Sequence, residues 1–206
     1  AYEKAPLIFE TRGLPRDKAA QADGWGKKMD RPEEFPDDGG IAVVVQCENG
    51  RVYCSSGGKV KITDNAGEEV HKVEGKTGTD LHFQNFIKAV RSRKHTDLNA
   101  DCEETHYSSA LCHTGLISHQ VGMPVHDSEV REKIASDAFL SGRYLAMQEH
   151  LDRNGVDLDS ETITLGPLLK FNADSERFEG NGDLDARANA LAKREYRKPY
   201  EVPDLS

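Results

Sequence analysis

The feature that most constrains this fold is a run of short apolar segments between residues 41 and 73. Each segment is either a run of β-branched residues or an alternation of polar and β-branched residues. Only a few residues separate each segment from the next. The first connection contains Asn49-Gly50, a dipeptide that favours the tight turns of hairpins. Because such short connections join antiparallel neighbours, the sequence predicts a meander of four strands, over residues 41–47, 51–55, 59–63 and 68–73.

Helical periodicity begins after the meander. Phe83, Phe86, Ile87 and Val90 recur at the spacing of one helical face, which predicts a core-facing helix capped by Asp80. A second helix is expected over residues 102–122, with Asp101 as its cap. Two more helices are expected, over about 128–154 and near 184–194. Strands followed by helices indicate an α+β fold, with an open, mainly antiparallel sheet, helices packed on one face, and a C-terminal helical and irregular tail.

The two ends of the chain have different characters. Residues 7–12 predict a further strand, and residues 13–39 predict a long loop, rich in glycine and proline, that contains Trp25. We expect residues 1–154 to form a sheet-and-helix domain that lacks its N-terminal part. Residues 155–206 are expected to form a tail that packs on this domain.

Composition excludes several classes of function. The net charge of −9 argues against nucleic-acid binding, and the basic run at residues 91–95 fits the dipole at a helix end better than a phosphate site. No apolar run approaches the ~20 residues that span a membrane. The four cysteines form no Cys-x-x-Cys pair, so reduced core cysteines are expected. We therefore expect a cytoplasmic protein, with export through a signal upstream of residue 1 left open.

The expected helix over residues 102–122 carries a polar stripe beside its apolar face. Helical spacing aligns the members of this stripe, which are Cys102, His106, Ser109, His113 and Gln120. Three interpretations stay open: structural histidines at the core edge, the wall of a substrate pocket, and a zinc site. Zinc is the weakest, because no second cluster supplies further ligands. The pocket candidates are His106 and His113, and also His82, which lies in the first turn of its helix.

No nucleotide site is predicted. Residues 75–77 read Gly-Lys-Thr like the end of a phosphate-binding P-loop, but Val70 stands where that motif requires a glycine. No Gly-x-Gly-x-x-Gly run follows any expected strand.

Several segments resemble, in the right order, the glucose–fructose oxidoreductase/inositol dehydrogenase (Gfo/Idh/MocA) family. Residues 7–15 are similar to the family's Phe-Glu-x-Arg strand and turn, and residues 82–94 to its HxxNFxxxVRSRK helix. Residues 110–115 are similar to its LCHLGNI segment. Residues 164–167, Phe178 and residues 194–200 are similar to its TLGP…RF…REYRxPW ending. The resemblance covers nearly the whole chain.

This resemblance implies a parent protein with an N-terminal Rossmann domain that binds NAD or NADP. In such a parent, a second domain holds a sugar or cyclitol for hydride transfer and forms homo-oligomers through its open sheet face. The chain lacks the family's glycine-rich fingerprint, its Glu-Lys-Pro motif and its Asp-x-x-x-His motif. Glu3-Lys4-Ala5-Pro6 only imitates the Glu-Lys-Pro motif, because it directly precedes the Phe-Glu-x-Arg strand. No catalytic, cofactor-binding or metal residue is therefore assigned.

We expect the chain to be the substrate-side and oligomerisation portion of a sugar dehydrogenase, without cofactor and inactive alone. Its expected partners are further copies of itself, the parent's Rossmann domain and a small sugar-like substrate. The alternative is a stand-alone, non-catalytic module that binds a sugar or a protein.

Overall fold

The computed structural model describes residues 5–23, 41–55, 58–73, 78–193 and 196–201. Trp25, residues 75–77 and Glu3-Lys4 lie outside these ranges. The chain divides into two compact units, and helices and small antiparallel sheets occur in it together. The first unit comprises residues 1–101 with 149–155, and the second comprises residues 102–148 with 156–206. The predicted α+β class is confirmed.

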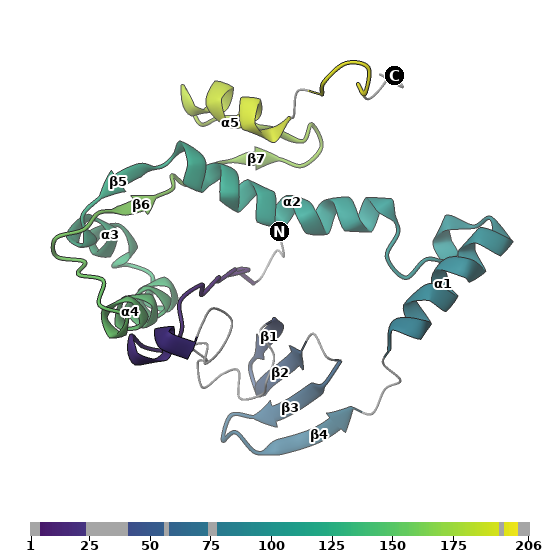
Figure 1. Ribbon diagram of the computed structural model, residues 1–206, viewed down its shortest axis with the longest axis horizontal. Helices are drawn as coiled ribbons and strands as arrows, with labels where there is room; N and C mark the ends of the chain where they lie inside the picture. Colours follow the sequence, from purple (N-terminus) through teal and green to yellow (C-terminus); the bar gives the residue numbers. More distant parts are fainter. Residues whose placement is uncertain (1–4, 24–40, 56–57, 74–77, 194–195, 202–206) are drawn as a thin grey trace. The chain divides into compact units, whose positions relative to one another are not determined.

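The main sheet of the first unit is the predicted meander (Figure 1). Its strands pair antiparallel in chain order. They are β1 (Ala42–Cys47), β2 (Gly50–Ser55), β3 (Val60–Asp64) and β4 (Glu69–Val73). In the turn after β3, the Asp64 carboxylate accepts hydrogen bonds from the backbone N–H groups of Ala66 and Glu68. The turn signals in the sequence therefore place all four strands correctly.

The two faces of this sheet differ in polarity. Directly paired residues share a face, so the register places His71 and seven apolar residues on one side. The apolar residues are Val43, Val45, Val52, Cys54, Val60, Ile62 and Val73. Val43 and Val45 on that side are 58% and 50% exposed. The opposite face holds Tyr53 and Thr63, which are buried, with charged residues around them. The more apolar face is thus the more exposed one.

Helix α1 (Thr79–Ser92) follows the sheet, and Gly78 rather than Asp80 is its N-cap. Asp80 lies one residue inside the helix, where its charge still complements the helix dipole. Arg93 ends the helix in a left-handed conformation. The apolar stripe was predicted to face the core, which is wrong for the described residues: Phe83 and Phe86 are 60% and 54% exposed, and Ala89 is the buried residue of the helix.

Two further parts of the first unit are fixed by asparagine side chains. Asn85 of α1 binds the end of the short 3-10 helix η2 (His95–Asp97), because its amide donates to the Asp97 carbonyl at 2.6 Å. Its amide oxygen accepts the Asn99 N–H at 3.0 Å. Buried Asn154 donates to the Pro15 carbonyl at 2.9 Å, close to the 3-10 helix η1 (Ala19–Asp23).

The strand predicted over residues 7–12 is absent. Leu7 and Phe9 are 57% and 72% exposed, and the segment has no ladder with the described strands. A strand requires a neighbour for its N–H and C=O groups, and the apolar pattern alone does not supply one.

The second unit contains the remaining helices and two small two-stranded sheets (Figure 1). In chain order its elements are α2 (Cys102–Val121), β5 (Met123–Val125), α3 (Asp127–Ile134), α4 (Ala138–Arg153), β6 (Ile163–Leu165), β7 (Phe171–Asn172), β8 (Arg177–Phe178) and α5 (Leu184–Ala192). The last turn of α4 belongs to the first unit. The strands pair antiparallel as β5 with β6 and β7 with β8.

The core of this unit lies where α5 and β8 pack on the C-terminal half of α2. Ile117, Phe178 and Ala188 are buried together, with Leu169 against them. Asn189 fixes β8 to α5, because its amide donates to the Phe178 carbonyl at 2.9 Å and its oxygen accepts the Phe178 N–H at 3.0 Å. The N-terminal half of α2 is outside this core, and its Tyr107 and Leu111 are 52% and 45% exposed.

The single helix predicted over about 128–154 is wrong, because the structure has two helices there. Residues 135–137 separate α3 from α4. The Asp137 carboxylate accepts the backbone N–H groups of Phe139 and Leu140 at 3.0 Å, which starts a new helix. Asp127 links the two helices, because its carboxylate accepts hydrogen bonds from Arg131 and from Tyr144.

The cysteines are free, as expected, but only Cys54 is partly buried. Cys47, Cys102 and Cys112 are exposed, so the prediction of core cysteines is wrong for these three. Among the described helices, none combines the length and apolarity needed to cross a membrane.

Candidate functional site

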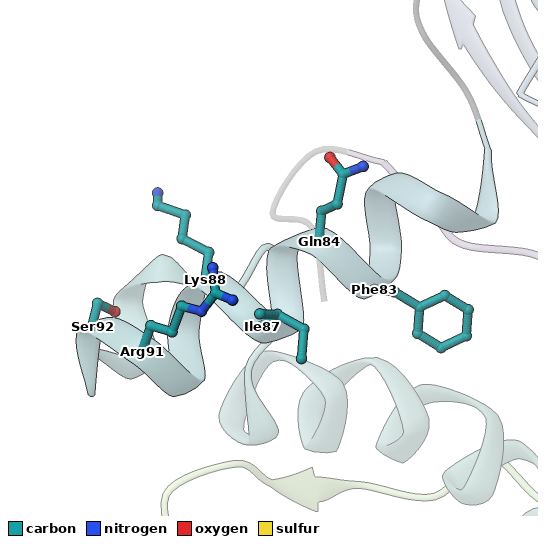
Figure 2. Close-up of a pocket in the computed structure, with 6 residues that line it drawn as sticks. All are labelled: Phe83, Gln84, Ile87, Lys88, Arg91 and Ser92. Atoms are coloured by element: carbon teal, nitrogen blue, oxygen red, sulfur yellow. The ribbon is translucent and has the colours of Figure 1, made fainter.

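One hollow in the described residues lies along α1 and is lined by that helix alone. Figure 2 shows its six residues spread along the helix, with Phe83 pointing away from Lys88 and Arg91. Side chains that diverge from one helix do not enclose a ligand, whereas binding sites are concave and bring polar groups together. This hollow is therefore the exposed side of an amphipathic helix.

Polar side chains converge instead at the exposed N-terminal half of α2. The His106 Nε2 atom lies 2.7 Å from the Glu176 Oε1 atom, and this contact joins α2 to the β7–β8 turn. Both side chains are about half exposed, at 54% and 51%. A histidine held by a carboxylate has its ring orientation fixed while its second nitrogen stays available to a ligand.

Tyr107 extends this cluster along the helix. Its hydroxyl donates to Glu103 Oε1 at 3.0 Å, and its ring lies 5.7 Å from the His106 ring, centroid to centroid. The hydrogen bond to the Glu103 carboxylate raises the pKa of Tyr107 above its ordinary value, and the charges of Glu103, Glu176 and Glu104 add to this effect. The phenol therefore stays protonated and can donate at neutral pH.

The position of Glu176 depends on a tight turn between β7 and β8. The Asn172 side chain accepts the backbone N–H groups of Asp174 at 2.9 Å and Ser175 at 3.3 Å. Glu176 follows with a φ of 51°, a left-handed conformation that is unfavourable for a residue with a Cβ. The packed core of β8 and α5 holds the two strands, and hence this turn, beside α2.

The cluster of His106, Tyr107, Glu103 and Glu176 offers the groups that a polyhydroxylated ligand needs. The carboxylates accept hydrogen bonds from hydroxyl groups, the histidine ring donates or accepts, and the tyrosine ring supplies an apolar surface. A histidine paired with a carboxylate is also suited to move a proton to or from a hydroxyl group. Groups of these kinds form the hydrogen bonds and stacking contacts by which proteins hold hydroxylated rings.

The three histidines proposed from the sequence have different environments. His106 is in the cluster, and His113 lies on the same stripe two turns further along α2. Within the described part of the chain, His113 is exposed and makes no hydrogen bond or ion pair. His82 belongs to the first unit, where its ring contacts Phe83 with 5.8 Å between centroids.

The remaining members of the polar stripe do not form a metal site with these histidines. No group of three or more histidine, cysteine or acidic side chains in the described ranges is arranged to hold a metal ion.

Sequence reasoning missed the acidic residues and the tyrosine of the cluster. Glu103 and Tyr107 are four residues apart on one helix, so the i, i+4 rule offered a signal for that pair. Glu176 is 70 residues from His106, and no local pattern joins them.

Comparison of this chain with protein-family models, with curated proteins and with solved structures finds no match.

Proposed function

We propose that this chain is the C-terminal, substrate-side and oligomerisation portion of an NAD(P)-dependent sugar or cyclitol dehydrogenase. The proposal rests on the ordered resemblance of its segments to the Gfo/Idh/MocA family. In this proposal the cofactor and the catalytic lysine and histidine belong to a Rossmann-containing part of the parent, and the helices cover one face of a larger open sheet. The chain itself contributes a pocket wall and contacts between subunits.

The observation that carries the substrate-side role is the contact between His106 and Glu176, with Tyr107 beside it. Sugars and cyclitols present rings of hydroxyl groups, and these match a site of carboxylates, an imidazole and an aromatic face. The open geometry suits one wall of a pocket that other residues of the parent complete. Affinity of this wall alone is accordingly expected to be weak, with a Kd in about the millimolar range.

Titration of the chain with myo-inositol and with glucose, followed by the NMR signals of the histidine rings, tests this role. We expect His106 to shift saturably. His106→Ala should abolish polyol binding as followed by the ring signals of Tyr107. Tyr107→Phe should weaken binding about threefold to tenfold, because the hydroxyl that orients the Glu103 carboxylate is lost.

His119→Ala supplies the matched control, since His119 is an exposed histidine in the last turn of the same helix. It should leave polyol binding unchanged. Equal loss in His119→Ala and His106→Ala, or no saturable shift with either polyol, would contradict the assignment.

A stand-alone sugar-binding module is the second candidate function. It is favoured by the location of the cluster, because both α2 and the β7–β8 turn belong to the second unit. NADH fluorescence separates this possibility from an intact enzyme, since the 206 residues contain no glycine-rich phosphate motif and should not bind the cofactor. Polyol binding of the chain at micromolar Kd would favour the module over a partial pocket wall.

A further inference from the structure

A second hollow lies at the opposite end of α2 from the His106 cluster. It has a volume of about 180 Å³ and is formed within the second unit by the end of α2, β5, β6, α3 and the first turn of α5. Fifteen residues of helix separate His106 from Val121 at its edge, which is roughly 20 Å at 1.5 Å per residue. The two sites are therefore distinct.

The walls of this hollow are mainly apolar. Val121 and Val125 are 2% and 9% exposed, and Leu165 and Leu184 are partly buried beside them. Gly122 brings the end of α2 close to β6, because a Cβ at this position would lie 2.7 Å from the Leu165 carbonyl oxygen. The space holds about six water molecules, so it suits a small ligand.

The charged residues that line this hollow are both cations, although the chain has a net charge of −9. Lys133 comes from α3 and Arg187 from α5, and neither makes an ion pair with a described residue. Two acidic side chains near them on the same helices accept hydrogen bonds from the backbone. Glu129 accepts the backbone N–H of His126 at 3.2 Å, and Asp185 accepts those of Gly180 and Asn181.

We propose that this hollow binds a small amphipathic carboxylate, such as a short aliphatic acid. Its apolar chain would contact Val121, Val125 and Leu165, and its carboxylate would pair with Lys133 and Arg187. Apolar walls favour a hydrocarbon body over a free inorganic anion, and two cations without an ion pair to a described residue favour a negative head over a neutral one. The proposal does not depend on the proposed sugar site.

Isothermal titration of the chain with hexanoate tests this proposal, with hexanol and inorganic phosphate as matched probes. We expect hexanoate to bind with a Kd in about the millimolar range. Hexanol lacks the charge and phosphate lacks the apolar body, so each should bind about tenfold more weakly. These comparisons use the unaltered chain and do not depend on whether a variant folds.

Lys133→Gln and Arg187→Gln should each weaken hexanoate binding about fivefold or more, because each removes one charged partner. Lys193→Gln, which neutralises an exposed lysine just after α5, should bind hexanoate as the unaltered chain does. The proposal fails if hexanoate shows no saturable binding up to about 20 mM. It also fails if hexanol binds equally well, or if neither Lys133→Gln nor Arg187→Gln changes the affinity.

Discussion

At the scale of single residues, the Asp127 carboxylate joins helices α3 and α4 through three side-chain partners. Its Oδ1 accepts the Tyr144 hydroxyl at 2.7 Å and the Gln148 amide, and its Oδ2 accepts Arg131 Nε at 2.6 Å. The hydrogen bond from Tyr144, followed by the interactions with Arg131, lowers the pKa of Asp127 below its ordinary 3.8. Burial and the same carboxylate raise the pKa of Tyr144.

Removal of the Tyr144 hydroxyl is expected to loosen the junction of α3 and α4. Tyr144→Phe should reduce the free energy of unfolding by about 1 kcal/mol and lower Tm by about 2–4 °C. Because the pKa of Asp127 is lowered in the folded state, its carboxylate stabilises the folded state at pH values above its unfolded-state pKa. This stabilisation is lost as the pH falls through the folded-state pKa. The difference between the two proteins should therefore be full at pH 7 and shrink below about pH 4.

Tyr196→Phe is the control for this prediction, because Tyr196 is 51% exposed. Thermal unfolding of the three proteins followed by circular dichroism at several pH values measures the effect. A difference in Tm between Tyr144→Phe and the unaltered chain that stays constant down to pH 2 would show that Asp127 is not involved.

Residue-scale contacts of this kind were only partly predictable from sequence. The periodicity of α2 identified His106 as a polar residue beside an apolar face, and the structure places it in a polar cluster. Its partner Glu176 is brought there by the packing of β8 and α5 on α2, which is a tertiary event. Local patterns specify helix faces, whereas contacts across 70 residues depend on packing.

At the scale of elements, the meander depends on Gly50 at the start of β2. Gly50 has a φ of 156°, and a Cβ there would collide with the Thr63 carbonyl oxygen of β3. Gly67, in the turn after β3, has a φ of 87° and no atom within 4 Å of the position of a Cβ. Substitution of Gly67 therefore tests backbone strain alone, whereas substitution of Gly50 adds a steric collision.

Gly50→Ala is expected to destabilise the sheet by about 2–4 kcal/mol, because both strain and collision apply. Gly67→Ala should cost about 1 kcal/mol, because the backbone strain acts alone. Urea unfolding of each variant, followed by the NMR signals of the Tyr53 ring as a probe of the sheet, measures the difference. Equal effects of both substitutions would argue against a close approach of β2 and β3 at Gly50.

Helices and strands were predicted correctly where the local sequence carried a strong turn or periodicity signal. Turn residues fixed the meander, and helical periodicity located α1 and α2. The break at residues 135–137 was missed, although Ser136-Asp137 is a capping sequence. The strand over residues 7–12 failed for the opposite reason, since its apolar pattern is clear but no described strand pairs with it.

At the scale of the whole molecule, one face of the meander exposes apolar side chains. Val43, Val45 and Val73 are 58%, 50% and 43% exposed on the same face. Contiguous apolar surfaces of this kind mark interaction sites in soluble proteins. The proposed oligomerisation role assigns this face to contact with a second copy of the chain.

A charge placed on that face should therefore weaken self-association. Val45→Lys is expected to shift the chain toward the monomer, because the ammonium group would be buried without a partner at the interface. Gln46→Lys introduces the same charge on the adjacent residue of β1, which points to the opposite face, and should leave the assembly unchanged. Size-exclusion chromatography with light scattering measures both, and circular dichroism checks that each variant remains folded. A monomeric unaltered chain, or equal dissociation of the two variants, would contradict assembly through this face.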